Sequence, residues 1–332
     1  MFSEETVMIT QLKRTIVFVA LLAVAGLSAS AQEKGKADKK ATGPLTNPVL
    51  WESVEGRSLD LYNGPGGTEM QPDVSRVEFI KEELQGHNKK YRIKDAKGRV
   101  WVAKLGREAQ PETSAVRLLY GLGYKTEINY LVPTLTIPGK GTFQNVRLEA
   151  RPENVERLDE WKWKENPFVG TNELQGLKIM MVFLTNWDLL DLQNKVLRVN
   201  NHGTVEHQFI ISDLGATFGK LGNNNLPFFF RLGRKTNDPA TWYEAGFVKG
   251  VEGGKIDFDF KGKGRNLMDD ITVAQGRWMA TRLAQLSDQQ LTDAFRAANY
   301  SAEDIKMLKD GFKSRLEELD KATRGANVAE TK

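Results

Sequence analysis

Three short runs of strand-like residues, separated by turn residues, constrain the fold of this chain more than any other feature. The runs cover 77–84, 91–94 and 100–105, and Gly, Asn and Asp residues lie between them. Short runs joined in this way are typical of an antiparallel meander. Pro111 and Glu112 then open a helix, because proline suits a first helical turn and an acid there favours the helix dipole. The sequence therefore predicts an antiparallel sheet followed by a helix.

The rest of the chain is expected to be mainly helical. The expected elements are strands over 129–137 and 144–148, a helix over 173–185 capped by Asn172, an apolar strand over 209–211, and helices over 271–286, 288–298 and 302–323. The predicted fold class is α+β with two lobes. An antiparallel-sheet lobe is expected over 49–150 and a mainly helical lobe over 151–332.

Composition excludes several classes of protein. The 332 residues are 40% hydrophobic and 27% charged, which rules out wholesale disorder and a fibrous repeat. Cysteine is absent, so no disulfide, thiolate zinc site or cysteine nucleophile is possible, and three histidines argue against a multi-histidine metal centre. A net charge of +4 is too small to indicate nucleic-acid binding. The basic residues within 255–265 are expected to form a solvated loop.

The first residues have the pattern of a secretory signal. Lys13 and Arg14 precede an apolar run over 16–27, and Ala29-Ser30-Ala31 supplies a cleavage site, so cleavage is expected after Ala31. A flexible leader rich in Lys, Ala and Gly follows over 32–48. The apolar run is short for a membrane span, and stable membrane insertion after cleavage is not expected. The sequence thus predicts a periplasmic or secreted protein.

Five polar residues occur in the order that phosphoryl transfer uses. Lys104 lies on a strand, Glu112 lies on the following helix, Asp188 and Asn194 belong to a polar loop, and Asp213 follows an apolar strand. Phosphoryl transfer needs a lysine on the nucleotide phosphates, an acid that orients it, a catalytic carboxylate, and Asn and Asp side chains for metal. Each residue alone has an ordinary structural explanation. Their order along the chain makes the combination informative.

These residues lie in motifs that resemble the protein-kinase-like superfamily. The likeness covers about 79–220 and is greatest to its atypical branches: HipA-like, phosphoinositide-kinase-like and CotH-like enzymes. The chain is also similar to an uncharacterised group of exported bacterial proteins. The matching motifs are Gly64-Pro65-Gly66-Gly67, Trp101-Val102-Ala103-Lys104, Pro111-Glu112, Asn186-Trp187-Asp188 and Asp213-Leu214-Gly215.

The resemblance implies a nucleotide site between the lobes of a two-lobed, kinase-like fold. Lys104 would contact the α- and β-phosphates of ATP and pair with Glu112. Gly86, in the turn between the first two strands, would let backbone amides approach the phosphates. ATP is therefore the cofactor that the resemblance implies.

The resemblance also implies the transfer chemistry. Asp188 would position an acceptor hydroxyl and take its proton, while Asn194 and Asp213 would bind Mg²⁺. The acceptor would be a hydroxyl of a protein, lipid or glycan. The function implied is an exported, ATP- and Mg²⁺-dependent phosphotransferase.

The sequence departs from the family pattern in several places, including the absence of His-Arg before Asp188, and leaves alternatives open. No G-x-G-x-x-G motif is present, so Gly86 would serve alone. Asp188 and Asn194 are six residues apart rather than the usual five, so the loop bulges or Asp191 shares the role. The alternatives are a catalytically silent ligand- or partner-binding protein, AMP transfer from the same cleft, and a hydrolase that uses Asp188 and Asp213 as an acid/base pair.

Overall fold

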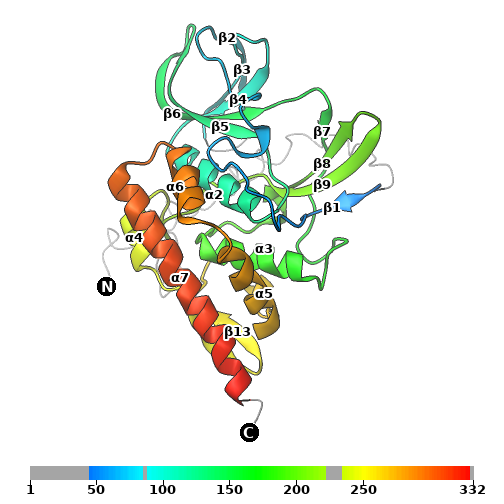
Figure 1. Cartoon of the computed structure of the whole chain (residues 1–332). Helices are drawn as coiled ribbons and strands as arrows, with labels where there is room; N and C mark the ends of the chain where they lie inside the picture. Colours follow the sequence, from blue (N-terminus) through cyan, green and yellow to red (C-terminus); the bar gives the residue numbers. More distant parts are fainter. Residues whose placement is uncertain (1–44, 85–87, 222–233, 330–332) are drawn as a thin grey trace, which may run out of the picture. The chain divides into compact units, whose positions relative to one another are not determined.

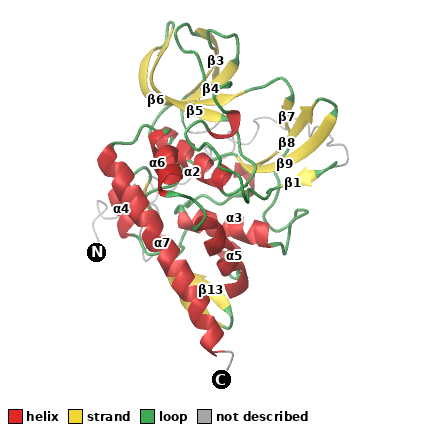
Figure 2. Ribbon diagram, viewed as in Figure 1, coloured by secondary structure: helices red, strands yellow, loops and turns green. Residues whose placement is uncertain are grey.

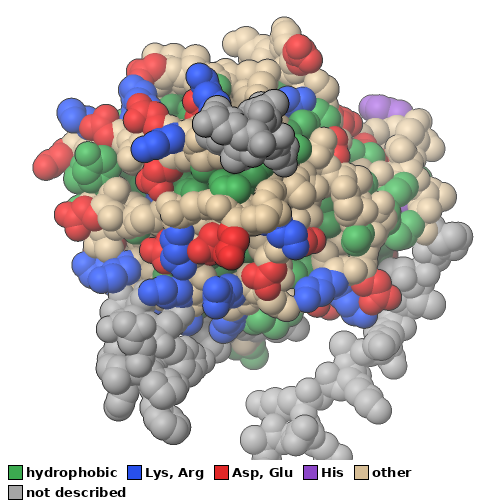
Figure 3. Space-filling model, turned by 90° about the horizontal axis from the view of Figure 1, so that it is seen from below, with side chains coloured by type: hydrophobic (Ala, Val, Ile, Leu, Met, Phe, Trp, Pro, Cys, Tyr) green, Lys and Arg blue, Asp and Glu red, His purple; other side chains and the backbone are tan. Residues whose placement is uncertain are grey.

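The computed structural model describes residues 45–84, 88–221 and 234–329, which belong to one compact unit, Pro44–Lys332. Three sequence-based expectations lie outside the described residues: the signal segment, most of the leader and Gly86. Among the described residues, no helix is long and apolar enough to cross a membrane. The face of the molecule seen in Figure 3 carries interspersed basic and acidic side chains, in line with the small net charge.

A five-stranded antiparallel sheet forms the first part of the structure (Figures 1 and 2). Its strand order is β2-β3-β4-β6-β5, and the first three strands are the predicted meander. In β3 alternate residues are buried, because successive side chains of a strand point to opposite faces. The strands are β2 (Glu78–Glu83), β3 (Lys90–Lys94), β4 (Val100–Lys104), β5 (Asn129–Ile137) and β6 (Gly141–Ala150).

Helix α2 (Ala109–Gly121) lies against this sheet. The helix starts two residues before Pro111, which was expected to be its first residue. Gly123 follows its end with φ +93°, a backbone conformation that favours glycine. Strands β5 and β6 contact the helix together with α6 (Asp288–Arg296). Most α2 side chains are therefore buried, including the polar ones.

A second sheet follows, with strand order β1-β9-β8-β7. Its centre is a hairpin of β8 and β9 that turns at His202 and Gly203, where φ is +50° and +92°. The sequence predicted only the apolar end of β9, because β8 is rich in Lys, Arg and Asn and its apolar residues do not alternate regularly with them. The strands are β1 (Pro48–Val49), β7 (Val155–Arg157), β8 (Asn194–Asn201) and β9 (Thr204–Ile211).

Helices and two small hairpins form the remaining part. Thr171, and not Asn172, caps α3, because its hydroxyl accepts a hydrogen bond from the Leu174 N–H at 3.2 Å. Aromatic side chains of Phe183, Trp242 and Phe247 pack edge to face in the core. The helices are α3 (Asn172–Phe183), α4 (Pro239–Glu244), α5 (Val273–Leu283), α6 and α7 (Ala302–Ala329); the hairpins are β10 (Lys220–Leu221) with β11 (Arg234–Lys235) and β12 (Val248–Glu252) with β13 (Lys255–Phe258).

The structure therefore has the α+β architecture that was expected, with an antiparallel-sheet part and a mainly helical part. An antiparallel sheet with one helix precedes a hairpin that ends at Asp213-Leu214-Gly215, and the later helices follow. The ion pairs of Lys104 with Glu112 and with Asp213 show that the end of β4, the start of α2 and the segment after β9 lie in one region.

The Gly64-Pro65-Gly66-Gly67 loop packs on Arg117 of α2. Arg117 is fully buried, donates to the backbone oxygens of Tyr62 and Asn129, and lies over the Tyr130 ring. Burial lowers the Arg117 pKa to about 10. A Cβ at Gly64 would lie 2.5 Å from the Arg117 guanidinium, so the loop can approach only without a side chain.

We expect Gly64→Ala to destabilise the protein more than Gly56→Ala. Both glycines have positive φ, +68° and +72°, so alanine is strained at either position, by about 1 kcal/mol. Gly56 has open space around its Cβ position, whereas Gly64 has the Arg117 guanidinium, which adds an overpacking cost of about 1–3 kcal/mol. Urea unfolding of the two variants measures the difference. Equal losses would contradict the packing role of Arg117.

Candidate active site

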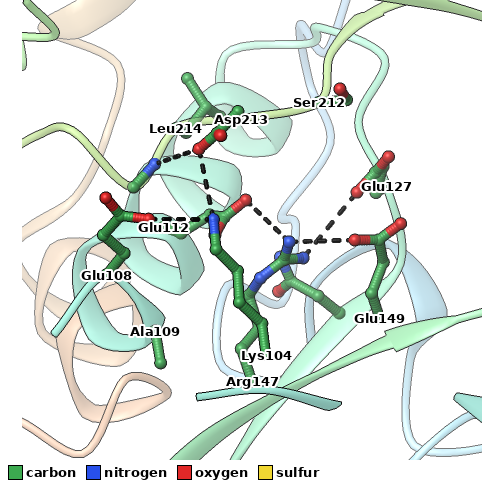
Figure 4. A network of polar contacts seen from close by, with 12 residues as sticks. Lys104, Glu108, Ala109, Glu112, Glu127, Arg147, Glu149, Ser212, Asp213 and Leu214 are labelled. Carbon is green, nitrogen blue, oxygen red and sulfur yellow. Dashed lines mark hydrogen bonds and ion pairs between the residues drawn. The ribbon is translucent and has the colours of Figure 1, made fainter. Parts of the chain in front are cut away.

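A buried ammonium group is the centre of the candidate active site (Figure 4). Lys104, the last residue of β4, is 4% exposed. Its Nζ lies 2.8 Å from Glu112 Oε2, 3.2 Å from Glu108 Oε2 and 3.3 Å from Asp213 Oδ1. The expected ion pair between Lys104 and Glu112 is thus present, next to Asp213. Glu108 and Glu112 are four residues apart, one helical turn, so both reach the same cation.

The charges around Lys104 determine its protonation. Burial by itself would lower the Lys104 pKa, but the carboxylates of Glu112 and Asp213 outweigh burial and raise the pKa above its ordinary value. For Asp213, burial would raise the pKa, yet the Lys104 charge and the Gly215 N–H lower it. Both groups are therefore ionised at neutral pH. The Asp213 side chain is 36% exposed, so this carboxylate forms the solvent-facing side of the cluster.

Gly215 allows the Asp213 segment to approach helix α2. Its φ is not positive, so a left-handed turn does not explain the glycine. A Cβ at this position would instead lie 2.6 Å from the Glu108 Cβ. The Gly215 N–H also donates to Asp213 Oδ1 at 3.3 Å, which orients the carboxylate. The Asp-Leu-Gly sequence thus combines an oriented acid with a close backbone contact.

Asp188 lies at the same end of the β8–β9 hairpin. Gln193 connects the two segments, because its Nε2 donates to Asp188 Oδ2 at 2.9 Å and its carbonyl accepts from the Ser212 N–H at 2.8 Å. The other oxygen of Asp188 lies 2.5 Å from Lys263 Nζ. Lys263 is held in place by its own N–H, which donates to the Trp187 carbonyl at 2.9 Å. Lys263, which was expected to lie in a solvated loop, is therefore paired with Asp188, the candidate catalytic acid.

Two non-glycine residues with positive φ flank these loops. Thr185 (φ +55°) precedes the Asp188 loop, and Phe218 (φ +51°) follows Asp213. The Phe218 N–H donates to the Leu184 carbonyl at 2.9 Å, and the Thr185 hydroxyl donates to the Gly219 carbonyl at 3.2 Å. Such conformations are costly for a β-branched residue and cluster at functional sites. These hydrogen bonds tie the two loops together.

Asn194 and Asp191 are engaged by the protein itself. Asn194 is fully buried, pairs with Ile211 in the hairpin, and its Nδ2 donates to the Trp161 carbonyl at 3.0 Å. Asp191 Oδ1 accepts from the Trp163 N–H at 3.1 Å. The amide that contacts Asp188 belongs to Gln193, which the sequence analysis did not consider. Its spacing of five residues from Asp188 was the signal that could have found it.

Arg147 is the second residue that the sequence analysis missed. It pairs directly with Lys104 across β4 and β6, so two cations lie side by side. Its Nη2 lies 2.7 Å from Glu112 Oε1 and 2.9 Å from Glu149 Oε2, and its Nη1 lies 3.8 Å from Glu127 Oε2. Glu112 therefore bridges Lys104 and Arg147 with its two oxygens (Figure 4). Burial raises the Glu112 pKa, although both cations oppose the shift.

The described residues contain no group of three or more His, Asp or Glu side chains arranged to hold a metal ion. Asp213 is the ionised, partly exposed oxygen donor next to Lys104. Mg²⁺ usually binds one or two protein carboxylates together with substrate phosphates and water. The chemistry of Asp213 fits that pattern of metal binding.

No family model matches the chain, and no curated protein matches it. Among solved structures, the proinflammatory kinase CtkA of Helicobacter pylori is similar at 11% identity over 76% of this chain and 98% of that one, with a TM-score of 0.47. Hydra Fam20 with sugar is similar at 9% identity over 78% and 88%, with a TM-score of 0.39. The Rio2 kinase of Chaetomium thermophilum, in an ADP/Mg²⁺-phosphoaspartate complex, is similar at 11% identity over 72% of each chain, with a TM-score of 0.27.

The buried carboxyl of Glu127 predicts a dependence of stability on pH. Burial and the neighbouring Glu149 charge raise the Glu127 pKa to about 7, against 4.5 in an unfolded chain. A raised acid pKa contributes stability at low pH, and that contribution is lost as pH rises through about 7. The melting temperature should therefore fall as the pH rises from about 5 to about 8, for a free-energy loss on the order of 2 kcal/mol.

In Glu127→Gln this fall should be smaller, because the amide cannot ionise. Glu317→Gln, at an exposed position on α7, is the matched control and should behave as the wild type does. Melting curves of the three proteins at pH 5, 6, 7 and 8 make the comparison. A fall of the same size in Glu127→Gln would show that Glu127 is not the titrating group.

Proposed function

We propose that this protein is an exported phosphotransferase that transfers phosphate from Mg²⁺-bound ATP to a hydroxyl group of a protein, lipid or glycan. The observation that carries the proposal is the position of Lys104, whose ammonium contacts both a helix carboxylate and the Asp213 carboxylate. An ammonium group held by a buried carboxylate is suited to bind phosphate, and a partly exposed carboxylate beside it is suited to bind metal. Helix α2 fixes this arrangement by placing Glu112 inside the structure.

The nucleotide phosphates would bind at Lys104. In the structure its ammonium is within 3.3 Å of three carboxylates, and Glu112 holds it through a buried contact. Asp213 is the most exposed of the three carboxylates and would bind Mg²⁺. The charge of the metal would then replace the Lys104 charge that Asp213 contacts in this structure. In the family pattern, Asn194 is the metal-binding residue besides Asp213. Gln193 is the stronger candidate, because its amide faces Asp188 whereas Asn194 is buried against Trp161.

Asp188 would act on the acceptor. Its carboxylate would orient the hydroxyl and take the hydroxyl proton as the new O–P bond forms. The bond between the γ-phosphorus and the bridging oxygen would break, and ADP would leave. Lys263 lies 2.5 Å from Asp188 and would hold the carboxylate in place, close to the incoming phosphate charge.

Export is part of the proposal. The basic residues, apolar run and Ala29-Ser30-Ala31 cleavage pattern support a secretory signal. N-terminal sequencing of the protein recovered outside the cytoplasm tests this point. Gln32 should be its first residue, and a first residue upstream of the apolar run would exclude cleavage.

Nucleotide binding should require Lys104 and Asp213. Isothermal titration of residues 32–332 with ATP and Mg²⁺ should show metal-dependent binding that Lys104→Met and Asp213→Asn each weaken at least about a hundredfold, since buried charge contacts are lost. Lys94→Met is the matched control, because Lys94 also lies on the sheet but is exposed and pairs with Glu78. Binding unchanged in both site variants would overturn the nucleotide site.

Phosphate transfer should depend on Asp188 more strongly than nucleotide binding does. We expect Asp188→Asn to lower the rate of label release from γ-labelled ATP by about 10²–10⁴ and to leave ATP affinity within a fewfold. Asp191→Asn, on the same loop but bound to the Trp163 N–H, is the control. Transfer of label from α-labelled ATP would indicate AMP transfer instead. Binding without any transfer would favour the catalytically silent alternative.

A further inference from the structure

A cavity of about 460 Å³ lies apart from the candidate active site. The segment before β5, the segment between β6 and β7, and strand β8 form its walls, and Lys104, Glu112, Asp188 and Asp213 do not line it. This volume is in the range of small-molecule sites in proteins. The apolar part of its lining includes Leu59, Met70, Tyr120, Ile128, Val155 and Leu197.

Basic side chains dominate the charged part of the lining. Arg57, Lys125, Arg151 and Arg157 line the cavity, against the two acids Glu52 and Glu127. Arg151 and Arg157 are 22% and 29% exposed at their side chains, so both are accessible from the cavity. An apolar wall with surplus positive charge suits a ligand that has an apolar body and an anionic group.

Two arginine donors on the buried side of the cavity have no acceptor among the described residues. Arg157 contacts both Glu127 and Glu149, and Arg151 also contacts Glu149. Arg147 lies behind these acids and is 2% exposed, yet its Nε and Nη1 have no hydrogen-bond partner among the described residues. A buried donor without an acceptor costs about 1–3 kcal/mol. An anion bound to Arg157 would replace Glu127 in its contact with that arginine. The Glu127 carboxylate could then accept a hydrogen bond from Arg147.

The same arginine reaches the candidate active site. Arg147 lies between Glu149 and Glu127 on one side and Glu112 on the other, and Glu112 holds Lys104 (Figure 4). A closer contact between Arg147 and Glu127 would weaken the hold of Arg147 on Glu112. Glu112 would then interact more fully with Lys104. The chain of alternating charges thus connects the cavity to the lysine.

We propose that this cavity is a second ligand site, for a small molecule with an apolar body and one carboxylate or phosphate group, and that its occupancy changes the Lys104–Glu112 pair through Arg147. The site lies outside the proposed nucleotide site and does not depend on it for binding. Arg157 and Arg57 hold the anionic group, and the apolar wall holds the body.

Octanoate and octan-1-ol separate the anionic contribution from the apolar one. Isothermal titration of residues 32–332 should show octanoate binding at least about tenfold tighter than the alcohol. Arg157→Gln should remove most of that difference, and Arg57→Gln, an exposed substitution that the fold tolerates, should reduce it. Arg296→Gln, on α6 and outside the cavity, should leave it unchanged. Equal affinity for acid and alcohol, or no binding of octanoate, would overturn the site.

The coupling has a readout that needs no nucleotide. The ¹⁵N ammonium resonance of Lys104, assigned by its absence in Lys104→Met, should shift when octanoate saturates the cavity. Arg147→Met should remove the shift while octanoate still binds. An unchanged resonance at saturation would overturn the coupling, whatever the outcome of the ATP titrations.

Discussion

The contact between the Lys104 ammonium and its three carboxylates is the interaction on which the rest of the site depends. The cation comes from the end of β4, Glu108 directly precedes α2, Glu112 lies in the first turn of α2, and Asp213 comes from the segment after β9. One side chain therefore joins three elements that are far apart along the chain. Removing the ammonium would leave Glu112 buried with Arg147 as its remaining cation, and an incompletely compensated buried charge is strongly destabilising. The site and the fold are held by the same contact.

Arg147 makes this site unusual in its electrostatics. Lys104 and Arg147 lie opposite each other on neighbouring strands and share Glu112. Like charges in that position repel, so the acids Glu112, Glu149 and Glu127 are needed to keep both cations buried. The charges of Arg151, Arg147 and Arg157 lower the Glu149 pKa despite its burial, whereas the Glu127 pKa is raised. Two neighbouring acids thus titrate in different pH ranges because one of them has the larger share of the arginines.

The sequence predicted the parts of the fold and the site that depend on local order. The meander, helix α2 and the C-terminal helices follow from turn residues and periodicity, and Lys104, Glu112 and Asp213 follow from their order on strand, helix and loop. Lys263 was not predicted as a partner of Asp188, because 75 residues separate them and only the tertiary fold brings them together. Arg147 looked like an ordinary strand residue until its pairing with Lys104 was known. Asn194 was assigned from the family pattern, although the register of the hairpin puts Asn194 opposite the buried Ile211.

The most direct test of the central claim is a crystal structure of residues 32–332 with a non-hydrolysable ATP analogue and Mg²⁺. The account predicts that the phosphates contact Lys104 Nζ, that Asp213 binds the metal, and that Glu112 keeps its contact with Lys104. It also predicts that the 460 Å³ cavity contains no nucleotide. Phosphates bound away from Lys104, or a metal bound without Asp213, would contradict the account.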